Sequence, residues 1–182
     1  MLETERILLR PIEFEDSEQV FRYRSDSETN KYQGFVPKLI EEVNQFITKN
    51  PTEINQIGSW FQLVIIEKAS HNIIGDIGIH FIGEDGYQSE LGCTLCKEKQ
   101  GKGFALEAMH ITMEYLFNSL NKHKIIGSVD PMNKNSINLL KRLNFRKEAH
   151  FKKSLLINGE WVDDMTYAIL KSDWNHTKEL LI

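Results

Sequence analysis

The segment Gln100–Ala105 (QGKGFA) holds the residues whose types and spacing best suit a ligand. Two glycines flank Lys102, and an amphipathic run begins immediately afterwards. A glycine inside a helix costs about 1 kcal/mol relative to alanine, so something other than helix formation must favour them here. A glycine loop that leads into a helix can point successive N–H groups at an anion, aided by the positive end of the helix dipole. We therefore predict that Gly101 to Ala105 bind a diphosphate, with a plain flexible turn as the alternative.

Two familiar nucleotide-binding motifs do not fit this loop. The P-loop pattern G-x-x-x-x-G-K-[ST] needs an earlier glycine that is absent, and Phe104 rather than a hydroxyl residue follows Gly103. The dinucleotide pattern G-x-G-x-x-G matches Gly101 and Gly103, but residue 106 is leucine and no βαβ pattern surrounds it. A nucleotide-binding regulator would therefore rest on the glycines alone.

The only cysteines, Cys93 and Cys96, have the C-x-x-C spacing that also occurs in zinc and redox sites. A zinc ion needs two further ligands, and the sequence has no His-x-x-x-His and no second cysteine pair to supply them. The pair also falls in an expected strand, where residues three apart point to opposite faces. We therefore expect two partly buried strand cysteines and no metal.

The chain has 182 residues, a length that suits a single domain with a substantial core. Its net charge of −4 argues against a nucleic-acid partner, which would need clustered lysine and arginine, and suits an amine partner better. No apolar stretch reaches the roughly 18 residues of a membrane span, and the start MLETERILLRP lacks an apolar secretory core. We expect a cytoplasmic protein without a membrane partner.

The first half of the chain predicts one strand, two helices and then three strands in series. Arg6–Pro11 is a short apolar run that ends in proline, and apolar residues recur at helical spacing from Asp16 and over Ile40–Ile47. Three β-rich runs joined by polar turns predict an antiparallel meander over Trp60–Ile66, Asn72–Ile82 and Ser89–Cys96.

A third helix is expected directly after the glycines. One buried face is indicated by the helical spacing of Ala105, Ala108, Met109, Thr112 and Leu116. Lys124–Val129 is the next expected strand.

The chain then predicts a fourth helix and a final hairpin. Asn133 can cap a helix that runs to Leu143, and Asn144 stands where a left-handed residue commonly ends a helix. Two strands, around His150–Ile157 and Trp161–Leu170, are joined by the hairpin sequence NG at residues 158–159. The resulting order is β-α-α-β-β-β-α-β-α-β-β.

These segments, in this order, resemble the GNAT superfamily of acyl-CoA-dependent N-acetyltransferases. The most specific motif is Q/R-x-x-G-x-G/A, met by Gln100, Gly103 and Ala105, and the second is N-x-x-S, met by Asn133 and Ser136. The opening LETERILLRPIEFED resembles the branch of ribosomal-protein N-terminal acetyltransferases (RimJ/RimL type). The resemblance covers nearly the whole chain.

The resemblance implies one GNAT domain over residues 1–182 with an α+β (mixed αβα) fold. A central, mostly antiparallel sheet of six to seven strands would be splayed in the middle and flanked by about four helices. The resemblance also makes a homodimer plausible.

The resemblance further implies acetyl-CoA as cofactor, with CoA as product. The pantetheine arm would pair with the backbone of Cys93, Thr94 and Leu95 as an added strand does, although these residues need no ligand to occupy a strand end. Asn133 and Ser136 would face the far side of the cofactor. The pyrophosphate would lie on the loop formed by Gln100, Gly101, Lys102, Gly103, Phe104 and Ala105.

Acetyl transfer requires a neutral amine, stabilisation of an oxyanion and a proton for the leaving thiolate. A backbone N–H near Leu95 could stabilise the oxyanion, a contribution of typically about 3 kcal/mol. Many family members carry a tyrosine that acts as general acid, late in the helix that corresponds to the one expected here after Asn133. The matching residue in this chain is Leu140. The nearest substitute that the resemblance offers is Ser136. No covalent intermediate is needed.

A carboxylate base that some members carry on the following strand is also missing, because SLLI occupies that region. The remaining base candidates are Glu90, His80 and Asp130, of which we favour Glu90. Each also has a purely structural interpretation: a strand-edge carboxylate, a half-buried strand histidine and a turn former beside Pro131.

Weak base assistance favours an amine of low pKa. At pH 7.4 roughly a fifth to a third of an α-amine is neutral, but only about 0.1% of a lysine ε-amine. We therefore expect the α-amine of a peptide or protein N-terminus as acceptor. The alternatives are a small amine (a polyamine, aminoglycoside or metabolite) and a catalytically silent acyl-CoA sensor. Tyr32, Phe35, Trp60 and Trp161 could line the acceptor site, although for each residue we favour core packing or hairpin capping.

Overall fold

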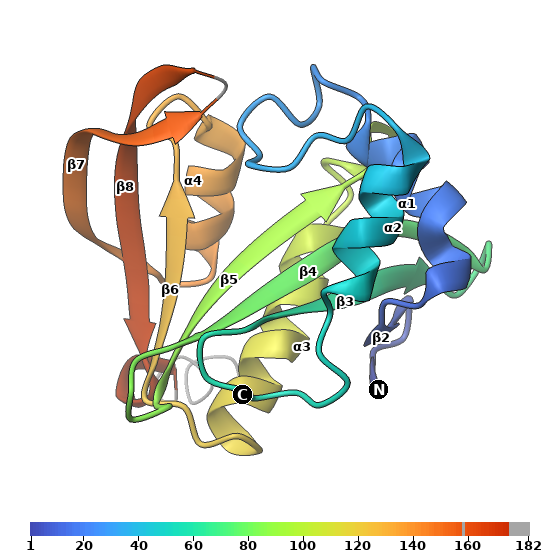
Figure 1. Cartoon of the computed structure of the whole chain (residues 1–182). Helices are drawn as coiled ribbons and strands as arrows, with labels where there is room; N and C mark the ends of the chain where they lie inside the picture. The colour runs from blue at the N-terminus through green and yellow to red at the C-terminus, as the bar shows by residue number, and fades with distance from the viewer. Residues whose placement is uncertain (158, 175–182) are drawn as a thin grey trace.

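The computed structural model describes residues 1–157 and 159–174, which form an eight-stranded sheet with helices on both faces (Figure 1). The strand order is β1-β2-β3-β4-β5-β6-β8-β7, and only β5 and β6 run parallel. The strands are β1 (Leu2–Glu3), β2 (Ile7–Pro11), β3 (Trp60–Glu67), β4 (Asn72–Ile82), β5 (Gln88–Leu95), β6 (Lys124–Val129), β7 (Arg146–Ile157) and β8 (Glu160–Leu170). The helices are α1 (Ser17–Arg24), α2 (Ile40–Thr48), α3 (Phe104–Asn118) and α4 (Lys134–Arg142), with short 3-10 helices η1 (Phe14–Asp16) and η2 (Lys97–Lys99).

The predicted mixed αβα fold is confirmed, but its sheet has eight strands rather than six or seven. The additional strand, β1, has two residues and pairs with β2. A two-residue strand is too short to show alternation in a sequence, so no pattern could reveal it. In the predicted final turn, Asn158 lies outside the described residues, and Gly159 has a φ of 84° that suits a hairpin turn.

Helix α3 packs against one face of the sheet, and α1 and α2 cover the other (Figure 1). The buried residues of α3 are Phe104, Ala108, Met109, Thr112, Met113, Leu116 and Phe117. They include the predicted apolar face except Ala105, which is partly buried. Because Phe104, Met113 and Phe117 are also buried, the covered face is wider than one stripe.

Strands β5 and β6 pair only where they begin. The ladder joins Gln88–Glu90 to Lys124–Ile126 and goes no further. Strand β5 then continues to Leu95 while β6 continues to Val129, and the two strands diverge (Figure 1). The predicted splay is therefore confirmed, and it leaves two strand edges able to pair with an extended ligand.

Helix α4 lies close to β6 because Gly127 has no side chain. A Cβ at this position would lie 2.9 Å from Leu140 Cδ2, so a larger residue would require the Leu140 side chain to shift. The Oδ1 atom of Asn133 accepts a hydrogen bond from the backbone N–H of Ser136 at 3.2 Å, which confirms the predicted N-cap. Asn144 has a φ of 62°, which confirms the predicted left-handed residue after the helix.

The described residues contain no helix long and apolar enough to cross a membrane. The same residues contain no group of three or more histidine, cysteine, aspartate or glutamate side chains that could hold a metal ion.

Candidate active site

A cleft of about 610 Å³ runs between the end of β5, the glycine loop and helix α4. Most of the cofactor-binding residues predicted from the sequence line it, namely Cys93, Thr94, Leu95, Gln100, Gly101, Gly103, Phe104, Ala105, Asn133 and Ser136. Lys102 is exposed and is not among the residues that line the cleft. The chain therefore brings together, in one cleft, segments separated by about 30 residues in sequence.

The glycine loop has a backbone that other residues adopt only with strain. Gly101 has a φ of 73° and Gly103 a φ of 86°, both in the left-handed region. A Cβ at Gly101 would meet no atom within 4 Å, so the loop surface is open there. Gly103 is also the N-cap of α3, whose first N–H groups have no partner within the helix. A left-handed turn at a helix start forms a concave set of N–H donors, and this geometry fits a diphosphate.

The opposite wall of the cleft is the α1–α2 loop (residues 25–39), which the sequence analysis did not include in the cofactor site. Its residues 28–33 line the cleft. The side chain of Asn30 holds the loop in place, because its Nδ2 atom donates to the carbonyls of Tyr23 at 2.6 Å and Asp26 at 2.9 Å. The loop carries no recognisable motif, and only the folded chain shows that it faces the glycines.

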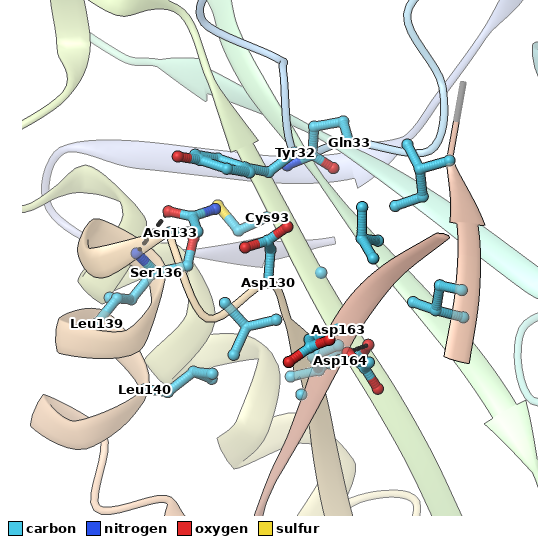
Figure 2. A pocket seen from close by; sticks show the side chains of 18 of the residues that line it. Tyr32, Gln33, Cys93, Asp130, Asn133, Ser136, Leu139, Leu140, Asp163 and Asp164 are labelled. Carbon is cyan, nitrogen blue, oxygen red and sulfur yellow. Dashed lines mark hydrogen bonds between the residues drawn. The ribbon is translucent and has the colours of Figure 1, made fainter. Parts of the chain in front are cut away.

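A second, smaller cavity of about 130 Å³ lies in the splay between β5 and β6 (Figure 2). Carboxylates of Asp130, Asp163 and Asp164 line it. The residues shared by the cleft and this cavity are Tyr32, Gln33, Cys93, Asn133, Ser136 and Leu139. The two spaces therefore meet beside β5 and the N-terminus of α4, where a group held in one can reach a group held in the other.

Two of the acidic residues of the smaller cavity, Asp163 and Asp164, come from β8. Asp164 Oδ1 accepts a hydrogen bond from the hydroxyl of Ser128 at 2.6 Å. Asp163 accepts one from the backbone N–H of Lys153 at 3.0 Å and pairs with His150 at 2.8 Å, and these contacts lower its pKa. The sequence analysis sought a carboxylate at SLLI on β7 and missed this pair on the adjacent strand. Two consecutive aspartates in an apolar strand were the available signal.

Glu90, the predicted base, does not line either of these two spaces. Its carboxylate lies 3.6 Å from His80 Nδ1, and Trp60 stacks on the His80 ring with 4.7 Å between centroids. Burial raises the pKa of Glu90; His80 opposes this shift and the charge of Asp164 adds to it. Glu90 is thus electrostatically linked to the acidic cavity, and its role as base stays a prediction.

Comparison with known proteins identifies the family. Residues 6–146 match the family model described as an acetyltransferase (GNAT) domain. The chain belongs to the GNAT acetyltransferases. It is 34% identical over 176 residues to the uncharacterized N-acetyltransferase YnaD of Bacillus subtilis, covering 94% of this chain and 98% of the relative.

Relatives of this GNAT chain differ in the acceptors that their names state. It is 32% identical over 123 residues to the [ribosomal protein uS5]-alanine N-acetyltransferase of Escherichia coli, covering 67% of this chain and 63% of the relative. It is 30% identical over 115 residues to the spermidine N(1)-acetyltransferase of Vibrio cholerae, covering 63% of this chain and 66% of the relative.

Solved GNAT structures share the fold. An acetyltransferase from Bacillus anthracis superposes with a TM-score of 0.84 at 30% identity, covering 94% of this chain and 98% of that one. The spermidine N-acetyltransferase of Vibrio cholerae in complex with CoA and spermine superposes with a TM-score of 0.81 at 24% identity, covering 94% and 99%. The protein is therefore an N-acetyltransferase that uses acetyl-CoA to acetylate an amine.

The two cysteines of this GNAT chain are free thiols. Burial raises the pKa of Cys93, and the nearby carboxylate of Asp76 raises it further. Burial also raises the pKa of Cys96. Because the thiolate is the nucleophilic form, these environments suit inert side chains better than an acyl-carrying nucleophile.

Proposed function

We propose that this GNAT enzyme acetylates the α-amine of a peptide or protein N-terminus, with acetyl-CoA in the long cleft and the amine in the smaller cavity. The observation that carries the proposal is that the two spaces meet at the splay, and that three acidic residues, Asp130, Asp163 and Asp164, line the smaller one. The acidic residue that lines the cleft is Glu28, which is paired with Lys31. Carboxylates attract an ammonium group. The named activity of the uS5-alanine relative supports an N-terminal acceptor.

The cleft residues suit distinct parts of acetyl-CoA. The N–H groups of the glycine loop and the start of α3 would hold the diphosphate. The unpaired edge of β5 at Cys93 to Leu95 would pair with the pantetheine arm, which carries amide groups like those of a strand. The side chain of Gln100 donates to the carbonyl of Leu95 at 3.1 Å and thereby joins the loop to this strand end. Asn133 and Ser136 would face the arm from α4.

Proton transfer is assigned to residues around the smaller cavity. When bound, acetyl-CoA supplies an activated acetyl thioester. The carboxylate of Asp164, which accepts a hydrogen bond from Ser128 and lines the cavity, is proposed to receive the proton of the incoming ammonium group. Glu90, whose pKa is raised, is proposed to accept that proton next. Ser136, on the wall shared by both spaces, is proposed to donate a hydrogen bond to the leaving thiolate.

The acceptor is tested by measuring CoA release with a panel of amines. The panel pairs a short peptide bearing a free N-terminus with the same peptide blocked at that end but containing lysine, and adds spermidine and an aminoglycoside. We expect kcat/KM for the free peptide to exceed that for its blocked partner by at least about tenfold, because its amine has the lower pKa. Transfer to lysine or spermidine without transfer to the free peptide would refute an N-terminal acceptor.

A polyamine is the second candidate, favoured by the number of carboxylates that face the smaller cavity. A polyamine carries several positive charges, whereas a peptide N-terminus brings one. Replacing Asp163 by Asn removes a carboxylate that the described contacts hold in its ionised form. If spermidine is the acceptor, this change should raise the KM for spermidine far more than that for a monoamine such as a peptide N-terminus.

A further inference from the structure

Arg6 lies immediately before β2, yet its side chain reaches the glycine loop, which is distant in the sequence. Its Nη1 atom donates to the carbonyl of Lys102 at 3.2 Å, and its Nε atom donates to Glu107 at 2.8 Å. Its Nη2 atom forms a second bond to the same Glu107 oxygen. The guanidinium also lies over the ring of Phe104, 4.6 Å from its centroid. One side chain thus contacts the loop and the first turn of α3 together.

The position of Glu107 makes this contact electrostatically important. Glu107 lies in the first turn of α3, close to the N–H groups that would bind a diphosphate. An unpaired carboxylate there would repel phosphate. Burial raises the pKa of Glu107, but hydrogen bonds from Thr4 and Arg6 outweigh burial, and the net pKa is lowered. Glu107 is therefore ionised at neutral pH, and Arg6 supplies the compensating charge.

Arg6 also sets the space available beneath the loop. A Cβ at Gly103 would lie 3.4 Å from Arg6 Nη2, so it would touch the guanidinium. The loop backbone at Gly103, where the left-handed turn joins α3, therefore lies next to the guanidinium.

We propose that Arg6 is a positioning residue for diphosphate recognition, and thus for selecting full CoA thioesters over donors that carry only pantetheine. Arg6 fixes the loop through the Lys102 carbonyl and neutralises Glu107, so that the N–H groups meet an anion without a competing charge. This inference rests on the proposed placement of the diphosphate at the glycine loop.

Calorimetric titration with CoA and with pantetheine, which lacks the diphosphate, tests the proposal without any turnover. Arg6→Gln should weaken CoA binding by about tenfold or more, a loss of roughly 1.4 kcal/mol, while pantetheine binding changes by less than about twofold. Arg6→Lys keeps the charge but loses the forked geometry, and its CoA affinity should fall in between. Lys68→Gln is the matched control, because it also removes one positive charge and breaks an ion pair to the N-terminal segment, with Glu3.

A double variant separates charge from simple damage to the fold. Arg6→Gln combined with Glu107→Gln removes both charges, and CoA affinity should recover in part relative to Arg6→Gln alone. Equal losses for CoA and pantetheine, or no loss of CoA affinity, would overturn the role of Arg6. If Arg6→Gln does not fold, the ratio of the two affinities in Arg6→Lys decides in the same way. If the wild-type protein binds CoA no better than pantetheine, the diphosphate placement itself is wrong.

Discussion

The guanidinium of Arg24 and the carboxylate of Asp76 form a buried ion pair, with 2.5 Å between Nη2 and Oδ1 and 2.9 Å between Nε and Oδ2. The hydroxyl of Tyr23 donates to the same carboxylate at 2.6 Å. These contacts fix the end of α1 on β4, directly before the α1–α2 loop that forms one wall of the cleft. The ion pair therefore anchors the start of the α1–α2 loop.

Replacing Asp76 by Asn should be among the most destabilising single changes in the chain. It would leave the buried charge of Arg24 without its counter-ion, which typically costs about 3 to 5 kcal/mol of unfolding free energy. Urea denaturation measures this loss. Lys68→Gln breaks an exposed pair with Glu3 and should cost far less, because solvent screens that pair. Equal losses for both variants would show that the buried pair has no special role.

Gly103→Ala should raise the KM for acetyl-CoA, because a Cβ disfavours the left-handed backbone and would touch Arg6. Gly58→Ala is a matched control: Gly58 has a similar φ of 79°, and a Cβ there meets nothing within 4 Å. Both changes should lower stability by about 1 to 2 kcal/mol through backbone strain. Only Gly103→Ala should alter the KM, as measured by steady-state kinetics. A shift of equal size in both variants would contradict the loop assignment.

The parts of the site that the sequence could predict are those recorded in local patterns. The glycine loop, the Asn133 cap and strand β6 each depend on residues that are close in sequence, so spacing and residue type reveal them. The α1–α2 wall and the Arg6–Glu107 contact depend on how distant strands are ordered in the sheet. Arg6 and Glu107 are 101 residues apart, and no local pattern records that they meet.

The choice of a general base shows a second limit of prediction from the sequence. The sequence analysis weighed Glu90, His80 and Asp130, and it found no carboxylate on the strand after the fourth helix because SLLI occupies that region. The β7–β8 pairing places Phe151 opposite Asp164, so β8 rather than β7 supplies carboxylates to the cavity. Register across a hairpin with two irregularities follows from the packed structure rather than from alternation.

Glu90→Gln should stabilise the protein at neutral pH. The folded pKa of Glu90 is raised above its usual 4.5 by burial, so folding opposes its charged form. The penalty is absent below pH 4.5, where the group is protonated in both states, and grows as pH rises through the folded pKa. Thermal unfolding should therefore show a higher Tm for Glu90→Gln at pH 7 and a vanishing difference near pH 4. A lower Tm at pH 7 would mean that the contact with His80 outweighs burial.

The two candidate carboxylates should differ in their kinetic effect. Asp164→Asn removes a carboxylate that lines the cavity, so kcat/KM should fall by about 10²-fold at pH 7 and recover as the amine deprotonates at high pH. Glu90→Gln should cause a smaller loss, because Glu90 does not line the cavity and acts only after the first transfer. The pH profiles of both variants measure this order. A larger loss in Glu90→Gln would restore Glu90 as the primary base.

Tyr32 is a second candidate, beside Ser136, for the proton donor to the leaving thiolate. Leu140 occupies the position where the resemblance places a tyrosine acid, and it lines the smaller cavity. Tyr32 lines both spaces from the α1–α2 loop, and its hydroxyl donates to the carbonyl of Met132 at 3.4 Å, next to the start of α4. A phenol from another element therefore lines the same cavity as Leu140 (Figure 2).

If this phenol donates the proton to the leaving thiolate, Tyr32→Phe should lower kcat by about 10²-fold and leave the KM for acetyl-CoA unchanged. Ser136→Ala is the parallel variant, because Ser136 lines the same two spaces. The ultraviolet absorbance of bound CoA reports its thiolate, and loss of the true donor should raise the thiol pKa in the complex. A raised thiol pKa in Ser136→Ala but not in Tyr32→Phe would assign the proton to Ser136, because only a group that contacts the sulfur can stabilise its charge.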